Sequence, residues 1–153
     1  MQAYEKDVFA WASEQARLLR VGRFDLLDIE HVAGEIEDVG KSEQRELASR
    51  MAVLLALLLK WQYQPERQGA SWEKTIRAQR KEVLYMLDES PSLMPKLAEA
   101  KWLDMVWARA VAQAVNETGL DCFPEVCPWT IEGEVLAETW FPLQPPVKGF
   151  CPQ

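Results

Sequence analysis

The sequence has one histidine, three cysteines and seven glycines that never cluster. With His31 as the single available base, Ser–His or Cys–His catalysis has little to build on, and no Gly-x-Ser-x-Gly or cysteine-nucleophile signature accompanies it. The scattered glycines supply no phosphate-cradling loop. These absences exclude triad hydrolases and phosphate-loop proteins as first interpretations.

No apolar run approaches membrane length. Residues 51–59 are nine uncharged apolar residues between Arg50 and Lys60, whereas a bilayer span needs about 20. We expect this run to be a helix that neighbouring helices cover on nearly all sides.

The sequence also has little that indicates secretion. Residues 1–15 lack the basic and then apolar pattern of a signal peptide. An odd number of cysteines argues against a disulfide framework and for a reducing compartment. We therefore expect a cytoplasmic protein.

What the chain does have is apolar and aromatic volume, with 48% hydrophobic residues and seven tryptophans. The net charge of −7 is unevenly spread: residues 1–40 hold four basic and nine acidic side chains, residues 41–81 nine and four, and residues 82–153 four and eleven. Two interpretations follow for the basic middle: it compensates the acidic ends within the fold, or it is a docking surface.

Helical spacing recurs in every long segment and strict alternation in none, so the chain is predicted to be all-α. Expected helices cover residues 4–21, a long segment from Asp25 or Asp28 to Pro65, residues 71–87 with Ser71 as cap, and a fourth from Pro91 or Pro95 to Thr118, with a short helix over 130–137. The predicted fold is an antiparallel bundle of about four main helices with one long central helix and an irregular C-terminal tail. Residues 1–142 are expected to form a single domain and residues 143–153 an extended or partly disordered tail.

The long segment carries one apolar stripe whose steps of 3 and 4 keep phase across Gly40. Glu43 occupies the one missing step, which predicts a buried carboxylate. We expect one helix through Gly40; the alternative is a helix that ends there and a new one that starts at Ser42. The stripe consists of Ile29, Ala33, Ile36, Gly40, Leu47, Met51, Leu54, Leu58 and Trp61.

Inner faces are predicted for the other helices from the same spacing. The first helix is expected to bury Tyr4, Val8, Trp11, Ala12, Leu18 and Leu19. The third is expected to bury Trp72, Ile76, Val83, Leu84 and Leu87, and the fourth Leu97, Leu103, Val106, Trp107, Ala110, Val111 and Ala114.

Metal-ligating residue types do not form a complete set. Asp28, His31, Glu35 and Asp38 share one helix face, but a carboxylate-bridged di-metal bundle needs a second histidine, which the chain lacks. A zinc site would have to combine Cys122 and Cys127, spaced C-x4-C, with Cys151 and His31, and that spacing is loose. An acidic solvated face is the favoured interpretation, and neither a metal nor a cofactor is predicted.

Two groups of side chains are candidates for a binding site. The first pairs carboxylates with arginines: a buried Glu43 needs a partner, and either a structural ion pair or a pocket would result. The second is aromatic: its tryptophans either plug one end of the bundle or stack on bases or anions with neighbouring cations. Together the candidate residues are Glu35, Asp38, Glu43, Trp61, Trp72, Arg77 and Arg80, and no catalytic residue is assigned.

Three blocks of the chain carry a recognisable pattern: YEKDVFAWASEQARLLRVGRFDLLDIEHVAGEIE, then EIEDVGKSEQRELASRMAVLLALLLKWQYQPERQGASWEKTIRAQRKEV with DESPSL, and FPEVCPWTIEGEVL. With these blocks the chain resembles the bacterial domain-of-unknown-function family 29. The resemblance implies an α-helical bundle and no established activity. The family's recurring motif falls on Glu35, Glu37, Gly40, Lys60, Trp61, Gln62, Pro65, Glu66, Trp72, Ile76, Gln79 and Arg80.

Three functional hypotheses remain open. The first is a non-enzymatic helical protein that associates with itself or with a protein partner, because aromatic surface is abundant and no catalytic set is complete. The second is a small-ligand binder or enzyme that uses the helix-borne carboxylates and arginines. The third is nucleic-acid contact through the basic middle segment, which would weaken steeply with salt.

Overall fold

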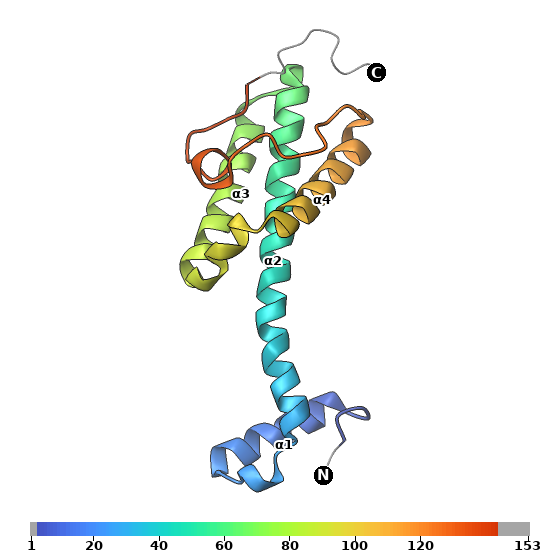
Figure 1. The fold of residues 1–153 in the computed structure, drawn as a ribbon, viewed down its shortest axis with the longest axis vertical. Helices are drawn as coiled ribbons and strands as arrows, with labels where there is room; N and C mark the ends of the chain where they lie inside the picture. Colours follow the sequence, from blue (N-terminus) through green and yellow to red (C-terminus); the bar gives the residue numbers. More distant parts are fainter. Residues whose placement is uncertain (1–2, 144–153) are drawn as a thin grey trace. The chain divides into compact units, whose positions relative to one another are not determined.

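The computed structural model describes residues 3–143, which form helices joined by short connections (Figure 1). The predicted all-α bundle with one long central helix is confirmed. The main helices are α1 (Val8–Val21), α2 (Ile29–Tyr63), α3 (Ala70–Glu89) and α4 (Ala100–Thr118). Shorter elements are the 3-10 turns η1 (Phe24–Leu26), η2 (Pro65–Arg67) and η3 (Pro91–Ala98) and the π-helical turn η4 (Ile131–Val135).

Helix α2 runs without interruption for 35 residues, straight through Gly40. Gly40 is exposed, and a Cβ atom added there would meet nothing within 4 Å. The glycine therefore marks neither a cap nor a close helix contact, and of the two alternatives that the sequence left open the single helix is the one observed.

The chain divides into two compact units, Met1–Glu43 and Gln44–Gln153, which we call the N-terminal and C-terminal units. Helix α2 contributes its first part to one unit and its second part to the other. The single domain predicted for residues 1–142 stays a prediction. Of the tail predicted for residues 143–153, only Leu143 lies within the described residues.

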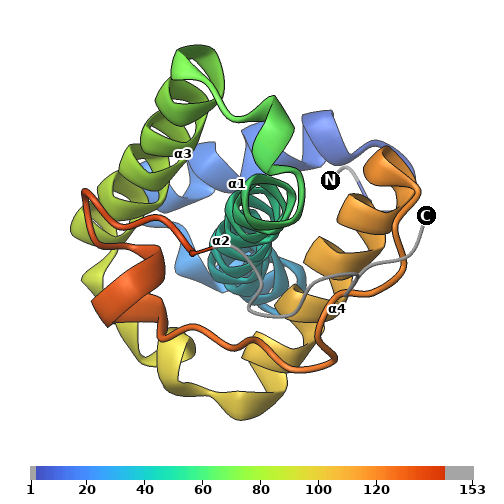
Figure 2. The ribbon, with the colours of Figure 1, turned by 90° about the horizontal axis from the view of Figure 1, so that it is seen from above.

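The core of the C-terminal unit forms around the second part of α2, between α3 and α4 (Figure 2). Successive helices α2, α3 and α4 alternate in direction (Figure 1). In the apolar run 51–59 only Val53 and Leu57 are partly exposed, so neighbours cover the run as predicted. None of the helices in residues 3–143 combines the length and apolar character needed to cross a bilayer.

The apolar stripe of α2 is exposed in the first part of the helix and buried in the second. From Leu47 to Leu58 its members are fully buried, as predicted. In the N-terminal unit the same stripe is exposed, with Ile29 at 64% and Ile36 at 67%. The prediction that these two residues are buried is wrong, because helical phase selects a face but does not provide the neighbour that covers it.

Other departures are local. Val8, Ala12 and Leu19 on α1 and Leu84 on α3 are exposed instead of buried. Helix α1 begins four residues later than predicted, because the Asp7 side chain accepts a hydrogen bond from the Ala10 N–H and caps it.

Two further helix starts also differ from the prediction. Gly69, and not Ser71, is the N-cap of α3, so that Ser71 lies in the first turn. Pro91 and Pro95 build the 3-10 helix η3, and α4 starts only at Ala100.

After α4 the chain crosses back over the bundle toward α3 (Figure 1). The Trp107 indole N–H donates to the Pro124 carbonyl, 2.9 Å away, and fixes the first part of this segment. Ile131, Val135 and Leu136 then pack into the core.

Candidate functional site

The N-terminal unit is held together by Asp28, which lies directly before α2. Its carboxylate accepts the Trp11 indole N–H at 2.9 Å and lies 2.8 Å from His31 Nδ1, while its backbone N–H donates to Gln15 Oε1 at 2.8 Å. Desolvation works to raise the pKa of Asp28, but the hydrogen bonds from Trp11 and His31 outweigh it and lower the pKa overall. Asp28 is therefore held as a carboxylate that ties α1 to α2.

Tyr4 completes this anchor from the start of the chain. Its ring stacks on His31 with centroids 4.2 Å apart and meets Trp11 edge-on at 4.9 Å. The Tyr4 hydroxyl donates to Glu35 Oε1 at 2.5 Å, and that hydrogen bond raises the pKa of Tyr4. Glu35, one of the predicted site residues, is thus fixed in position on α2.

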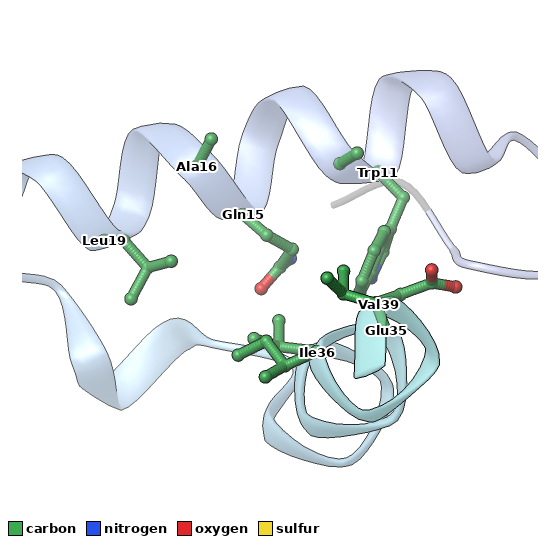
Figure 3. Close-up of a pocket in the computed structure, with 9 residues that line it drawn as sticks. Trp11, Gln15, Ala16, Leu19, Glu35, Ile36 and Val39 are labelled. Carbon is green, nitrogen blue, oxygen red and sulfur yellow. The ribbon is translucent and has the colours of Figure 1, made fainter. Parts of the chain in front are cut away.

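A groove of about 330 Å³ opens between α1 and α2, beside this anchor (Figure 3). Helix α1 crosses α2 in the close-up, and the side chains of Trp11, Gln15 and Ile36 extend into the space between them. The lining is mostly apolar. Its residues are Trp11, Ala12, Gln15, Ala16 and Leu19 from α1, and Val32, Glu35, Ile36 and Val39 from α2.

Gln15 is the one polar α1 side chain in the groove lining, and it is 2% exposed. Its Oε1 accepts the Asp28 N–H, but its buried Nε2 has no hydrogen-bond partner within residues 3–143. A buried donor without a partner costs about 1–3 kcal/mol. Native proteins rarely leave such a group unsatisfied, so this amide is an unusual feature of the groove lining.

Large apolar side chains are exposed in the N-terminal unit, and three of them, Leu19, Ile36 and Val39, line the groove. Within the described residues, nine of the fifteen large hydrophobic side chains that are exposed belong to residues 8–39. An apolar surface of this kind typically marks an interaction site. The nine are Val8, Phe9, Leu19, Val21, Phe24, Leu26, Ile29, Ile36 and Val39.

The model of the family described as domain of unknown function DUF29 matches residues 3–141. The chain belongs to the DUF29 family. No curated protein and no solved structure matches the chain. The DUF29 description carries no activity, so function has to be argued from the geometry.

Arg80 of this DUF29 chain is a structural residue. It is 2% exposed, and its Nε, Nη1 and Nη2 donate to the carbonyls of Val135, Glu138 and Trp140 at 2.8, 3.0 and 2.7 Å. Desolvation, and then the charge of Arg77, lower the pKa of Arg80. The guanidinium fastens the C-terminal segment to α3 and is not available to a carboxylate or a ligand.

The aromatic candidates also hold this segment in place. Trp61 meets Trp72 edge-on at 6.0 Å and packs on Phe141 at 4.8 Å. Arg77 pairs with Glu73 at 2.7 Å, and its guanidinium lies 5.9 Å from the Phe141 ring centre. These contacts agree with the interpretation that the tryptophans plug the end of the bundle.

The remaining DUF29 candidates are carboxylates. Glu43 is exposed, so the prediction of a buried carboxylate is wrong: the stripe of α2 is uncovered at this position. With Arg80 held by carbonyls and Arg77 by Glu73, the proposed pairing of Glu43 with either arginine is not formed. Asp38 is exposed, and its charge contributes to the raised pKa of Tyr4.

Metal and thiol chemistry gain no support from the part of the DUF29 fold that is described. No group of three or more His, Cys, Asp and Glu side chains in residues 3–143 is arranged to hold a metal ion. Cys122 is disulfide-bonded. Cys127 has a free thiol, and burial raises its pKa, which makes it a poor nucleophile.

Trp11 and Gln15, which line the groove, and Tyr4, which packs beside it on Trp11, were missed as functional candidates. Trp11 and Gln15 are one helical turn apart and followed by Leu18, a signal of a shared face. A glutamine on an otherwise apolar face was the clue available in the sequence.

Proposed function

We propose that this chain acts by binding a helical segment of another protein in the groove of its N-terminal unit. The observation that carries the proposal is the unsatisfied, buried Gln15 amide within an exposed apolar surface. Both features are costly for the free chain, and a partner that covers the groove removes both costs.

The N-terminal unit has little core of its own. Among residues 3–43, only Trp11, Gln15 and Leu18 are buried. Chains near 40 residues rarely bury enough surface to be stable without additional support. Covering a side chain such as Ile36, now 67% exposed, contributes roughly 1.5–3 kcal/mol, so a partner stabilises this unit strongly.

A helix is the partner shape that the groove favours. The walls are two crossing helices, and their exposed residues Leu19, Ile36 and Val39 form an apolar strip. Amphipathic helices bind such strips with side chains spaced by three and four residues. A small molecule is the weaker alternative, because about 330 Å³ is near the lower limit of ligand pockets and the surrounding apolar residues would stay exposed.

The experiment compares the wild-type chain with Ile36→Gln and Leu84→Gln. Both positions are exposed on helices, but only Ile36 lines the groove. A partner is isolated by cross-linking in the native host, purified, and titrated against each chain. The proposal expects at least tenfold weaker binding for Ile36→Gln and unchanged binding for Leu84→Gln; equal binding by all three chains would refute it.

We include a cytoplasmic location in the proposal, because an odd number of cysteines is typical of a reducing compartment. The disulfide at Cys122 weighs against it, because oxidising compartments favour such bonds. Cell fractionation in the native host decides between the cytoplasm and an oxidising compartment.

A further inference from the structure

We infer that the segment bound in the groove is an amphipathic helix with basic flanks that places a hydrogen-bond acceptor against Gln15 Nε2. The inference rests on the proposed function and adds the chemistry of the partner. Two independent observations support it: the charge of the N-terminal unit and the unpaired amide in its groove.

The charge observation comes from residues 1–43, which hold ten acidic and five basic side chains, a net charge of −5 with His31 neutral. The excess is concentrated on α2, where residues 29–43 carry five carboxylates and one lysine. None of the ion pairs in residues 3–143 uses Glu43, an exposed carboxylate one helical turn beyond the groove residue Val39 on the same face of α2. A lysine or arginine that flanks an apolar helix face would compensate this carboxylate.

The same charge decides against two other occupants. A second copy would bring another net −5 onto the first, and like charges across an interface oppose association. An anionic membrane surface attracts basic segments and repels an acidic one. A separate, basic chain is the occupant that the electrostatics favour.

The amide observation sets the polarity of the contact point. Gln15 Oε1 is already used by the Asp28 N–H, so the amide group cannot rotate without losing that bond. Gln15 lines the groove, and its buried Nε2 stays a donor without a partner among residues 3–143. The partner has to meet it with an oxygen, from a Ser, Asn, Gln or Asp side chain or from a carbonyl at the end of its helix.

The test uses the full chain and three synthetic probes of about 18 residues, long enough for a stable helix. One carries leucines at helical spacing with lysines elsewhere, the second replaces the lysines with glutamates, and the third is the lysine peptide with one glutamine on its apolar face. Binding is measured by calorimetry at low and physiological salt. The inference expects the lysine peptide to bind at least tenfold more tightly than the glutamate peptide, with the difference shrinking as salt rises.

Four variants separate the contributions. Ile36→Gln should weaken binding of the lysine peptide about tenfold, whereas Leu84→Gln should leave it unchanged. Glu43→Gln should weaken it severalfold at low salt. Gln15→Met removes the donor without adding a titratable group, and should abolish the gain in affinity that the glutamine-bearing probe shows with wild type.

Failure of the inference and failure of the proposed function look different. If the glutamate peptide binds as well as the lysine peptide and Ile36→Gln weakens both, the groove binds helices but the basic partner is refuted. If the chain self-associates through Ile36 and excludes every probe, the basic partner is again refuted. If no probe binding responds to Ile36→Gln, and the partner titration also ignores this variant, the proposed function fails as well.

Discussion

Replacing Arg80 by methionine tests whether one guanidinium fastens the C-terminal segment to the bundle. Methionine retains most of the apolar stem but removes every donor. The carbonyls of Val135, Glu138 and Trp140 then lose the partners that now lie 2.7–3.0 Å away. We expect the free energy of unfolding to fall by about 3–5 kcal/mol, the range for breaking a buried charged contact.

Two estimates limit that magnitude from above. The buried Val135 carbonyl without a donor would cost about 1–3 kcal/mol, and the partly buried carbonyls of Glu138 and Trp140 less, if the segment stayed in place. Detachment of the segment would let water reach the carbonyls, but would expose Ile131, Val135 and Leu136 at about 1.5–3 kcal/mol each. The protein adopts whichever of the two responses costs less free energy. The loss in the free energy of unfolding therefore cannot greatly exceed a few kcal/mol.

Arg77→Met is the matched control on the same helix. Arg77 is exposed, pairs with Glu73 four residues away, and lies as near to the Phe141 ring as Arg80 does, 5.9 against 5.6 Å. An exposed pair of this kind contributes about 0.3–0.5 kcal/mol. Urea unfolding followed by tryptophan fluorescence gives both values, and hydrogen exchange of residues 131–142 shows whether the segment has detached. Equal losses for Arg80→Met and Arg77→Met would refute the structural role of Arg80.

Three further predictions concern α2. Gly40→Ala should raise the free energy of unfolding by about 1 kcal/mol in thermal denaturation, because Gly40 is an exposed helical residue with open space around it; destabilisation would contradict the continuous helix. In urea unfolding, Leu54→Ala should lower the free energy of unfolding by about 2–5 kcal/mol and Ile36→Ala by less than about 0.5 kcal/mol, although both residues belong to one stripe. Similar losses for the two variants would show that the first part of α2 is buried. The hydrogen bond from Lys60 lowers the pKa of Glu117 below 4.5. The stabilisation from this pair is therefore complete above that pH and is lost as the pH falls through the lower pKa of the folded state. Lys60→Met should make acid unfolding less steep, and an unchanged acid profile would argue against the pair.

Helical periodicity was enough to predict the bundle and the buried half of α2. Leu47 to Leu58 recur with the helical period inside a run too short for a membrane, and three other amphipathic helices were available to cover them. The uninterrupted helix through Gly40 followed from the unbroken phase, since one exposed glycine costs only about 1 kcal/mol.

Periodicity could not show which half of the stripe is covered. Ile29 and Ile36 carry the same pattern as Leu54, and the difference depends on whether another helix packs there. The pairing of Glu43 with Arg80 was predicted wrongly for a related reason. A buried arginine can be satisfied by backbone carbonyls, and these come from an irregular segment whose path leaves no periodic signal in the sequence.

The groove could not be predicted from the sequence, because each of its residues, taken singly, has an ordinary structural interpretation. Trp11 reads as a core residue and Gln15 as a surface one. Only their arrangement around one space, with one amide that has no partner among residues 3–143, indicates a binding site.

Hydrogen exchange of the full chain, alone and with its purified partner, tests the central claim most directly. The account predicts that the partner slows exchange in residues 8–21 and 29–43 and leaves residues 70–118 unchanged. Slower exchange confined to residues 70–118, with none in the two groove helices, would contradict it.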